Sequence, residues 1–474
     1  MDLFNPADRR PVHFMGVGGA GMSALAVLAC RRGVVVTGCD TDLAGAQDVI
    51  ASGAQVMLGH DPSHVTGTRA VVVTAAVPDT HPELEQARAA GIPVVPRKEA
   101  LGGLVNGMTV VGAAGTHGKT TTTSIATWVA EVGGLNPSFL VGGVVQNFGA
   151  SFRVTDSEYF VIEGDEYDTA YFDKKPKFMH YLPEIAIVNN IEFDHADIYD
   201  DLEDIKWEFS RLMNLVPSNG RLIAGVDSPV VRDVLADMEG KLFTTVETFG
   251  LSDGAKWQAR YIDFTGDVTR FTVFKDGHNW GEFETHLIGE FNVRNCLGVI
   301  IAADAWGISR ENIQEAFNTF KSVKRRMEVR GVERGVTVID DFAHHPTAVE
   351  ETLKALRMKY DGHRLIAVFE PRSWSSRLAV FQEPYGKAFS YADYVIIADV
   401  YNTSKASELG KVLDVDELVK DIQLQGKPAH SFADADTIVE HLAPELREGD
   451  VVAIMSNGGF GGIHDKLLDV LKAS

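Results

Sequence analysis

The chain has few cysteines, no long apolar run and no excess of basic residues. Its 474 residues include only Cys30, Cys39 and Cys296, which lie far apart and lack the spacing of a metal-binding motif. Such a set is typical of a reducing cytosol, and we interpret all of them as small core hydrophobes. No apolar run approaches the roughly 18 residues of a membrane helix, and Met1–Pro6 lacks the regions of a signal peptide. The sequence therefore predicts a cytoplasmic protein without membrane insertion.

The formal net charge is −22, which argues against nucleic acid or an anionic membrane as a partner because both attract basic patches. The same charge opposes nucleotide binding. A phosphate site must therefore depend on local N–H groups, a few Lys or Arg side chains and a divalent cation. Hydrophobic residues make up 45% of the chain, as in globular proteins. No sequence feature predicts an obligate protein partner.

Apolar strands alternate with amphipathic helices along the chain, which predicts α/β domains with parallel, doubly wound sheets. Asn106-Gly107 is a turn signal, and Asp276-Gly277 predicts a β-hairpin. The length favours about three domains. We expect a Rossmann-like domain over residues 1–107, a central domain of the P-loop ATPase type over 108–328, and a C-terminal Rossmann-like α/β domain over 329–474.

The most informative motif lies between an apolar strand and an amphipathic helix, and its residues are Gly115, Thr116, His117, Gly118, Lys119, Thr120 and Thr121. A turn of this kind directs backbone N–H groups at phosphate oxygens; Lys119 can reach the β- and γ-phosphates, and the Thr120 hydroxyl can bind Mg²⁺. A P-loop ordinarily has glycine where this chain has Ala113, and alanine is compatible if that position needs no positive φ. The alternative is an ordinary glycine-rich turn before a threonine-rich helix.

A second glycine motif, Gly16-Val17-Gly18-Gly19-Ala20-Gly21, follows the first predicted strand, and Asp40 ends the next one. This pattern fits a dinucleotide-binding turn with a ribose-binding acid. The same glycines can hold any diphosphate at a helix N-terminus, including that of UDP. An NAD-dependent enzyme, a sugar-nucleotide site and glycines that serve only tight packing therefore stay open at this point.

Acidic and histidine residues follow two further strands of the central domain. Glu163-Gly164-Asp165-Glu166-Tyr167-Asp168 crowds four carboxylates at a strand end, which predicts a cation site with Glu166 as its ligand. The alternative is a solvated acidic turn. His195, within Asn189–Asp197, is a candidate second metal ligand or proton-transfer group. The alternative is a structural histidine.

Further candidate residues lie just before the third domain and at the ends of its strands. Arg325 and Arg326 precede the domain, where a hinge could direct a guanidinium at phosphate. Asp341 and His345 lie in a strand-to-helix turn. The remaining candidates are Arg372, Arg377 and a glycine-rich loop that begins with Ser456 and Asn457, which could present N–H groups to a peptide carboxylate.

Together these motifs resemble the Mur ligase family, ATP-dependent amide ligases that add amino acids to UDP-N-acetylmuramate in peptidoglycan assembly. Within the family, three segments resemble the branch that uses the free tripeptide L-Ala-γ-D-Glu-meso-diaminopimelate. They are residues 163–174, 192–197 and 456–462. The branch that adds L-alanine typically reads E-A-D-E-S-D and G-A-G at two of these places.

The resemblance implies a role for each matching residue. It implies ATP binding by the 115–121 turn and by Asn292, Asn295, Arg326, Asp341 and His345, with catalysis by Lys119, Glu166 and His195. Thr120, Glu166 and His195 would hold Mg²⁺. UDP-N-acetylmuramate would be bound by Gly16, Gly18, Gly19, Gly21, Met22 and Asp40, and the peptide by Arg372, Arg377, Ser456 and Asn457. Domain closure would move the third domain about the region near Arg330.

Overall fold

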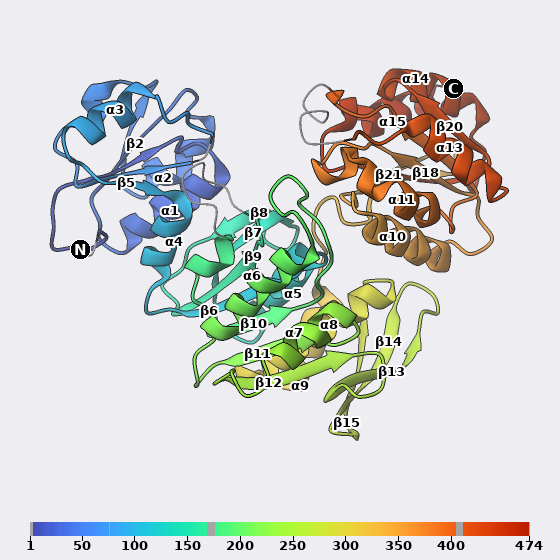
Figure 1. Cartoon of the computed structure of the whole chain (residues 1–474), viewed down its shortest axis with the longest axis horizontal. Coiled ribbons are helices and arrows are strands. Elements are labelled where there is room, and N and C mark those ends of the chain that lie inside the picture. Colours follow the sequence, from blue (N-terminus) through green and yellow to red (C-terminus); the bar gives the residue numbers. More distant parts are fainter. Residues whose placement is uncertain (1–2, 75, 168–175, 404–410, 474) are drawn as a thin grey trace. The chain divides into compact units, whose positions relative to one another are not determined.

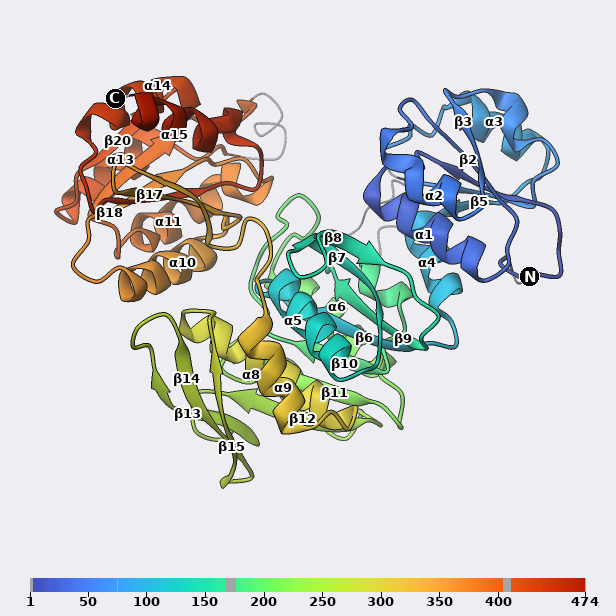
Figure 2. The same cartoon turned by 180° about the vertical axis from the view of Figure 1, so that it is seen from behind.

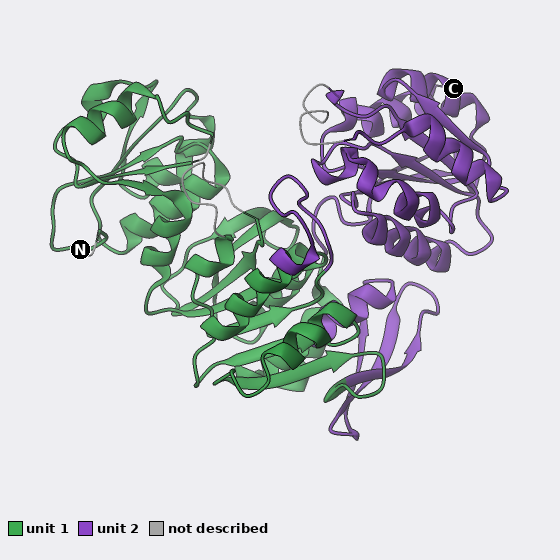
Figure 3. Cartoon of the chain, in the orientation of Figure 1, with its two compact units in different colours: residues 1–191, 205–257, 298–321 green, residues 192–204, 258–297, 322–474 purple. Residues whose placement is uncertain are grey.

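The computed structural model describes residues 3–74, 76–167, 176–403 and 411–473, and Figures 1 and 2 show the chain from opposite sides. The chain forms two compact units (Figure 3). Unit 1 contains residues 1–191, 205–257 and 298–321, and unit 2 contains residues 192–204, 258–297 and 322–474. Residues 168–174 of the acidic motif lie outside the described residues.

The first sheet of unit 1 is parallel throughout, in the order β3-β2-β1-β4-β5. Its strands are β1 Val12–Met15, β2 Val36–Asp40, β3 Gln55–Leu58, β4 Ala70–Val73 and β5 Val94–Pro96, and its helices are α1 Ala20–Arg31, α2 Gln47–Ala51, α3 Pro82–Ala89 and α4 Arg97–Val105. Helix α3 and the turn Pro62–Val65 cover one face, over a core that includes Met15 and Leu84. The order in which successive strands are added reverses between β1 and β4, the switch point at which open α/β sheets bind ligands. The expected parallel, doubly wound first sheet is confirmed.

The central strands of unit 1 follow the order β12-β11-β10-β6-β9-β7-β8. They are β6 Thr109–Ala114, β7 Ser138–Val145, β8 Ala150–Arg153, β9 Tyr159–Gly164, β10 Ile185–Val188, β11 Arg221–Gly225 and β12 Thr245–Gly250, with helices α5 Lys119–Val132, α6 Leu202–Leu215, α7 Pro229–Asp237 and α9 Arg310–Thr319. Strand β6 pairs in parallel with β9 and β10. The carboxyl ends of these strands therefore lie side by side, which brings the turns after β6 and β9 next to Asn189 and Asn190, the start of the segment after β10.

Unit 2 contains a β-hairpin and part of a long helix, α8 Glu290–Ala305. Strand β13 Trp257–Asp263 comes first in the chain. Strands β14 Thr269–Lys275 and β15 His278–Thr285 follow it and pair with each other in antiparallel orientation. Their turn residues, Asp276 and Gly277, have φ of +49° and +77°, the left-handed pair that a two-residue hairpin turn requires. The predicted hairpin is confirmed.

The C-terminal sheet of unit 2 has the order β16-β17-β21-β18-β19-β20 and is parallel except for the edge strand β16. Its strands are β16 Glu328–Glu333, β17 Val336–Asp341, β18 Leu365–Phe369, β19 Tyr394–Ala398, β20 Ala429–Phe432 and β21 Val451–Met455. Its helices are α10 Pro346–Lys359, α11 Gln382–Ala388, α13 Val415–Leu424, α14 Ala435–Leu442 and α15 Ile463–Ala473.

Alternate residues of the C-terminal strands face two separate cores, as the period of two in a strand requires. Ile339 and Phe369 pack with α10, α11 and α13, whereas Val338 and Val368 pack with α14 and α15. The doubly wound α/β class expected for this part of the chain is confirmed. Arg330 lies inside β16, and its guanidinium contacts Asp340 and Asp465 at 3.4 and 2.9 Å. The motion expected near Arg330 and the boundaries at 107/108 and 328/329 stay predictions.

Candidate active site

The turn between β6 and α5 has the geometry expected of a phosphate-binding loop. Gly118 caps the helix with φ of +82°, a left-handed conformation that only glycine adopts without steric cost. Ala113, where the motif ordinarily has glycine, lies inside β6 and is buried, so its position needs no positive φ. Thr120 and Thr121 are buried in the first turn of α5.

Lys119 is held at the centre of this turn. Its Nζ atom donates to the carbonyl oxygens of Gly115 and Thr116 at 2.7 and 3.1 Å and lies 2.9 Å from a carboxylate oxygen of Glu166. Burial lowers the pKa of Lys119, but the charges of Glu166 and Asp165 outweigh burial and raise it. The ammonium group is therefore retained at neutral pH, as phosphate binding requires.

The hydroxyl of Thr120 contacts Glu163, a residue of the acidic motif to which the sequence assigned no individual role. Its hydroxyl donates to Glu163 at 2.8 Å, and the second oxygen of Glu163 accepts from the N–H of Gly142 at 2.7 Å. Burial and the charge of Asp165 raise the pKa of Glu163. A hydroxyl bonded to the half-buried Glu163, with the buried carboxylate of Glu166 in the same turn region, is a donor set that Mg²⁺ prefers. The residues present therefore fit this ion, with Glu163 as an additional candidate ligand.

Asn190, just after the neighbouring strand β10, holds the phosphate-binding turn in place. Its Oδ1 atom accepts from the N–H of His117 at 2.8 Å, and its Nδ2 atom donates to the carbonyl of His117 at 3.2 Å. Its own carbonyl accepts from the N–H of Thr116 at 3.1 Å. Sequence reasoning placed Asn190 at a strand end but gave it no role, and only the pairing of β6 with β10 reveals the clamp.

The glycine loop after β1 is anchored by Asp40. The carboxylate accepts from the N–H of Gly18 at 2.8 Å, and the pKa of Asp40 is lowered because such bonds to N–H groups outweigh burial. Gly16 opens the loop with φ of +72°, and Gly19 is the N-cap of α1. Met22 is buried within α1, so its side chain contributes to the core.

A basic residue that the sequence did not indicate also lies at the glycine loop. The guanidinium of Arg97, at the start of α4, lies against Gly21, where a Cβ atom would come within 2.5 Å of Nη1. A cation beside the N-terminus of α1 favours an anionic ligand, since both carry positive charge. Arg97 is thus a candidate for diphosphate binding.

In unit 2, His195 follows a buried carboxylate and has an uncommon backbone conformation. Its φ is +53°, its N–H donates to Asp194 at 2.6 Å, and its Nε2 atom lies 3.9 Å from the same carboxylate. Burial would raise the pKa of Asp194, but the charges of His195, His345 and His344 outweigh it and lower the pKa. A left-handed residue held in this way is typical of functional turns.

The other residues expected to contact the nucleotide have partners inside unit 2. Asn295 donates to Asn292 at 3.2 Å, and both are buried in α8. The carboxylate of Asp341 accepts from the N–H groups of Met327 and Ala343 at 2.7 and 2.8 Å, and burial raises its pKa. His345 caps α10 through the N–H of Thr347. The guanidinium of Arg326 lies 5.0 Å from the ring centre of Phe342.

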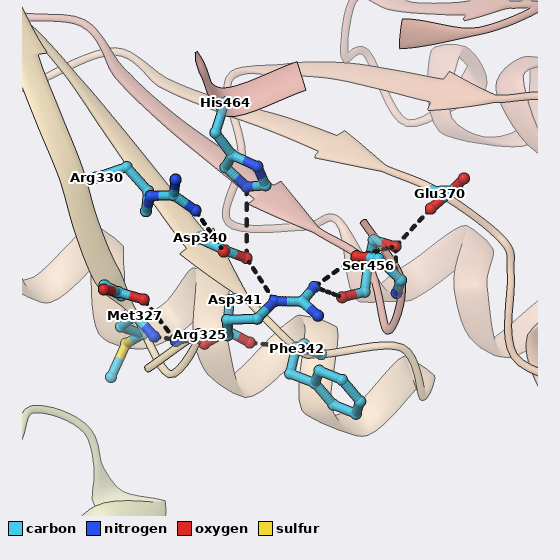
Figure 4. Close-up of polar contacts among 12 residues, drawn as sticks. Arg325, Met327, Arg330, Asp340, Asp341, Phe342, Glu370, Ser456 and His464 are labelled. Atoms are coloured by element: carbon cyan, nitrogen blue, oxygen red, sulfur yellow. Dashed lines mark hydrogen bonds and ion pairs between the residues drawn. The ribbon is translucent and has the colours of Figure 1, made fainter. Parts of the chain in front are cut away.

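The candidate peptide-binding residues gather at the carboxyl ends of β18 and β21. The hydroxyl of Ser456 donates to Glu370 at 2.5 Å and accepts from the N–H of Gly458 (Figure 4). Arg372 lies 3.9 Å above the ring of Tyr401 and 3.4 Å from Glu370. Among the described residues, nothing donates a hydrogen bond to the buried Oδ1 atom of Asn457.

The side chain of Arg377 is buried, whereas that of Arg372 is partly exposed. It donates to the carbonyl oxygens of Ser373 and Tyr401 at 3.2 Å each, and its guanidinium lies 4.1 Å from the ring centre of Trp374. Burial lowers the pKa of Arg377. Its observed contacts fix the segment after β18, and a direct contact with a peptide stays a prediction.

Three family descriptions match the chain in succession. They are "Mur ligase family, catalytic domain" over residues 11–109, "Mur ligase middle domain" over 113–303 and "Mur ligase, glutamate ligase domain" over 325–458. The chain belongs to the Mur ligase family. Members of this family are ATP-dependent ligases that form amide bonds, and this chain is such a ligase.

Relatives within the Mur ligase family match almost the whole chain. The UDP-N-acetylmuramate–L-alanyl-γ-D-glutamyl-meso-2,6-diaminoheptandioate ligase of Escherichia coli K12 is 37% identical, over 97% of this chain and 98% of its own. The UDP-N-acetylmuramate–L-alanine ligase of Salinibacter ruber is 35% identical, over 98% and 95%. The solved structure of a murein peptide ligase from Psychrobacter arcticus is 30% identical, with a TM-score of 0.68, over 98% and 99%. Within the described residues, no helix is both long and apolar enough to span a membrane.

Proposed function

We propose that this Mur ligase joins UDP-N-acetylmuramate to the free tripeptide L-Ala-γ-D-Glu-meso-diaminopimelate with hydrolysis of ATP to ADP and phosphate, a step of peptidoglycan recycling. The phosphate-binding turn with Lys119 between β6 and α5 carries the ATP-dependent part of the proposal. The choice of tripeptide is supported by the 37% identity to the Escherichia coli ligase named for that substrate. We further propose a cytoplasmic location.

ATP would be bound by the turn from Gly115 to Thr121, and Lys119 would neutralise charge on the γ-phosphate. The buried ion pair of Lys119 with Glu166 supports this role, because it keeps the ammonium protonated and in place. The family resemblance adds contributions from unit 2, which we retain as predictions for Asn292, Asn295, Arg326, Asp341 and His345.

Thr120, Glu163 and Glu166 would hold Mg²⁺, and the resemblance adds His195 for a further ion. Bound Mg²⁺ would offset the repulsion between the substrate carboxylate and the triphosphate. The Thr120–Glu163 hydrogen bond, which already joins two of these ligands, supports the assignment. Asp194 would orient the imidazole of His195.

UDP-N-acetylmuramate would be held by the glycine loop from Gly16 to Gly21, with Arg97 as an added cation. Asp40 would keep the loop in shape through the N–H of Gly18. The parallel sheet and its switch point support this placement. Amide ligation involves no hydride transfer, so a ligase has no need of a nicotinamide cofactor at this loop. We therefore propose UDP-N-acetylmuramate, and not NAD, as the ligand of this loop.

In the proposed reaction, the lactyl carboxylate attacks the γ-phosphorus of ATP. The bond to the β,γ-bridging oxygen breaks, which gives an acyl phosphate and ADP. The α-amine of the tripeptide's L-alanine then attacks the acyl carbon, phosphate leaves, and the amine loses a proton. Lys119 would stabilise charge on the transferred phosphoryl group, and His195 or a neighbouring carboxylate would accept the proton.

The test is phosphate release by the full chain with UDP-N-acetylmuramate, ATP and either the free tripeptide or L-alanine. We expect turnover with the tripeptide to exceed turnover with L-alanine by at least tenfold. Lys119→Ala should abolish turnover and leave the affinity for UDP-N-acetylmuramate nearly unchanged. Turnover with L-alanine alone would assign the chain to the alternative activity, which the 35% identity to the Salinibacter ruber enzyme supports. Binding of ATP without product from either amine would contradict both.

A further inference from the structure

Four side chains of the first sheet converge at a point that the ligase reaction does not use. They are His13 on β1, Cys39 on β2, His64 in the turn Pro62–Val65 and Glu83 on α3. One ligand atom from each lies within 4.8 Å of every other. His13, Cys39 and Glu83 have no exposed surface, and His64 is mostly buried. The cluster therefore interrupts the apolar core between the sheet and α3.

The distances within the cluster are close to those between ligands of one metal ion. Cys39 Sγ lies 3.3 Å from Nε2 of His13 and 3.4 Å from Oε2 of Glu83, and Nδ1 of His64 lies 2.9 Å from Oε1 of Glu83. Tetrahedral Zn²⁺ with bonds of about 2.0–2.3 Å places its ligand atoms roughly 3.3–3.6 Å apart. The remaining pairs of ligand atoms lie within 4.8 Å of each other, so a bound ion would draw the four side chains closer together.

Hydrogen bonding alone accounts poorly for the surroundings of Cys39. Two imidazole nitrogens, from His13 and His60, and both oxygens of Glu83 lie within 3.5 Å of its sulfur. A thiol carries one proton and is a weak donor. Several lone-pair donors of mixed N, S and O type around one buried thiol are the set that zinc prefers. The fully buried carboxylate of Glu83 accepts from the N–H of Asp61 at 2.9 Å and contacts His64, and a cation would add to this compensation of its charge.

We propose that His13, Cys39, His64 and Glu83 bind one Zn²⁺ ion in a closed, structural site. The ion would join β1, β2, the turn before β4 and α3 at one point. His60 would lie at the solvent side, with Nδ1 at 3.2 Å from Cys39 Sγ and its ring against His81. This proposal is independent of the substrate assigned to the ligase.

The site would also support the glycine loop. The carbonyl oxygen of Cys39 accepts from the N–H groups of Gly16 and Val17 at 2.9 and 3.2 Å, and Asp40, the next residue, holds Gly18. A metal bond to Cys39 would therefore fix the strand end on which this loop is built. Metal removal should lower the thermal stability of the first sheet first. A loss of affinity for UDP-N-acetylmuramate should accompany it, an expectation that rests on the proposed function.

The experiment starts from the full chain stripped with a chelator and then titrated with Zn²⁺ alone or Co²⁺ alone. We expect one bound ion per chain, a thiolate-to-cobalt charge-transfer band in the near ultraviolet, and a higher melting temperature with Zn²⁺. Cys39→Ser should remove the band, and Glu83→Gln should weaken Zn²⁺ binding at least tenfold. Cys30→Ser is the matched control, because Cys30 lies on α1, outside the proposed set of ligands. This variant should retain both the band and the affinity.

Wild-type protein gives the decisive result even if a variant fails to fold. No uptake of Zn²⁺ at equimolar metal, or a Co²⁺ complex without a thiolate band, would overturn the proposal. Loss of the band in Cys30→Ser together with its retention in Cys39→Ser would also overturn it, because the ion would then be bound elsewhere.

Discussion

Arg325 forms a hydrogen bond with the backbone of Ser456, a residue 131 positions further along the chain. Its Nη2 atom donates to the carbonyl oxygen of Ser456 at 2.6 Å and to that of Gly458 at 2.7 Å (Figure 4). Its Nε atom lies 3.3 Å from a carboxylate oxygen of Asp340. An arginine that the sequence suggested for phosphate binding thus holds the loop after β21 in shape.

Replacing Arg325 with lysine should damage this loop, because an ammonium group cannot reproduce the planar fork that serves two carbonyls and a carboxylate. We expect Arg325→Lys to destabilise the C-terminal sheet by about 1–3 kcal/mol and to raise KM for the tripeptide several-fold, with a smaller effect on KM for ATP. Thermal unfolding and steady-state kinetics measure both. The exposed Arg447→Lys is the control, and equal effects of the two substitutions would contradict this role for Arg325.

Adjacent glycines of the same loop allow a sharper test of Arg372. A Cβ atom on Gly458 would lie 2.1 Å from Nε of Arg372, whereas one on Gly459 would meet nothing within 4 Å. Gly458→Ala should therefore displace the arginine and raise KM for the tripeptide at least fivefold, as Arg372→Ala should, while KM for ATP changes less. Gly459→Ala should behave as the wild type. A normal KM for the tripeptide in Gly458→Ala and Arg372→Ala would argue against peptide recognition by Arg372.

Local patterns in the sequence predicted much of this fold. The alternation of strands and helices expected over residues 1–107 is present in the first sheet. The Asp276-Gly277 hairpin and the turn at Gly118 are present because glycine and turn residues act within a few positions. Strand ends carrying polar residues also predicted where the candidate sites would form, since carboxyl ends of parallel strands share one edge.

Contacts between distant segments could not be predicted in this way. The clamp by Asn190 depends on the pairing of β6 with β10. Arg97 is recognised only where α4 approaches Gly21. Cys39 is buried, as expected, but its polar neighbours come from residues 13 to 83 and show no motif spacing. Asp341 had the residue type of a ligand, and its internal hydrogen bonds appear only in the structure.

The clamp by Asn190 gives a prediction that separates ATP use from sugar-nucleotide use. Asn190→Ala removes two hydrogen bonds to His117, so the N–H groups of the turn should lose their common orientation. We expect kcat/KM for ATP to fall by about 10–100-fold, that is about 1.4–2.7 kcal/mol, with unchanged affinity for UDP-N-acetylmuramate. Isothermal titration and phosphate release measure the two. Asn279→Ala, exposed on β15, should be silent, and a loss of sugar-nucleotide affinity in Asn190→Ala would contradict a local role.

Asp340 should make the C-terminal sheet sensitive to acid. Burial would raise its pKa, but His464, 3.4 Å away, and Arg325 outweigh burial and lower it (Figure 4). The unfolded chain, with an ordinary Asp pKa of about 3.9, therefore takes up a proton at higher pH than the folded chain does. Stability rises with pH wherever the unfolded state binds more protons. The contribution of Asp340 is thus complete above the unfolded pKa and is lost as pH falls through the folded pKa.

Asp340→Asn should consequently be less stable than the wild type at neutral pH, by about 1–3 kcal/mol, and this difference should shrink between about pH 5 and pH 3. Thermal unfolding across that range measures the difference directly. In the control Asp361→Asn, an exposed turn residue of the same unit, the difference from the wild type should stay small and independent of pH. A constant difference for Asp340→Asn would mean that its carboxylate has the same pKa in both states, and that the contacts with His464 and Arg325 do not favour its charged form.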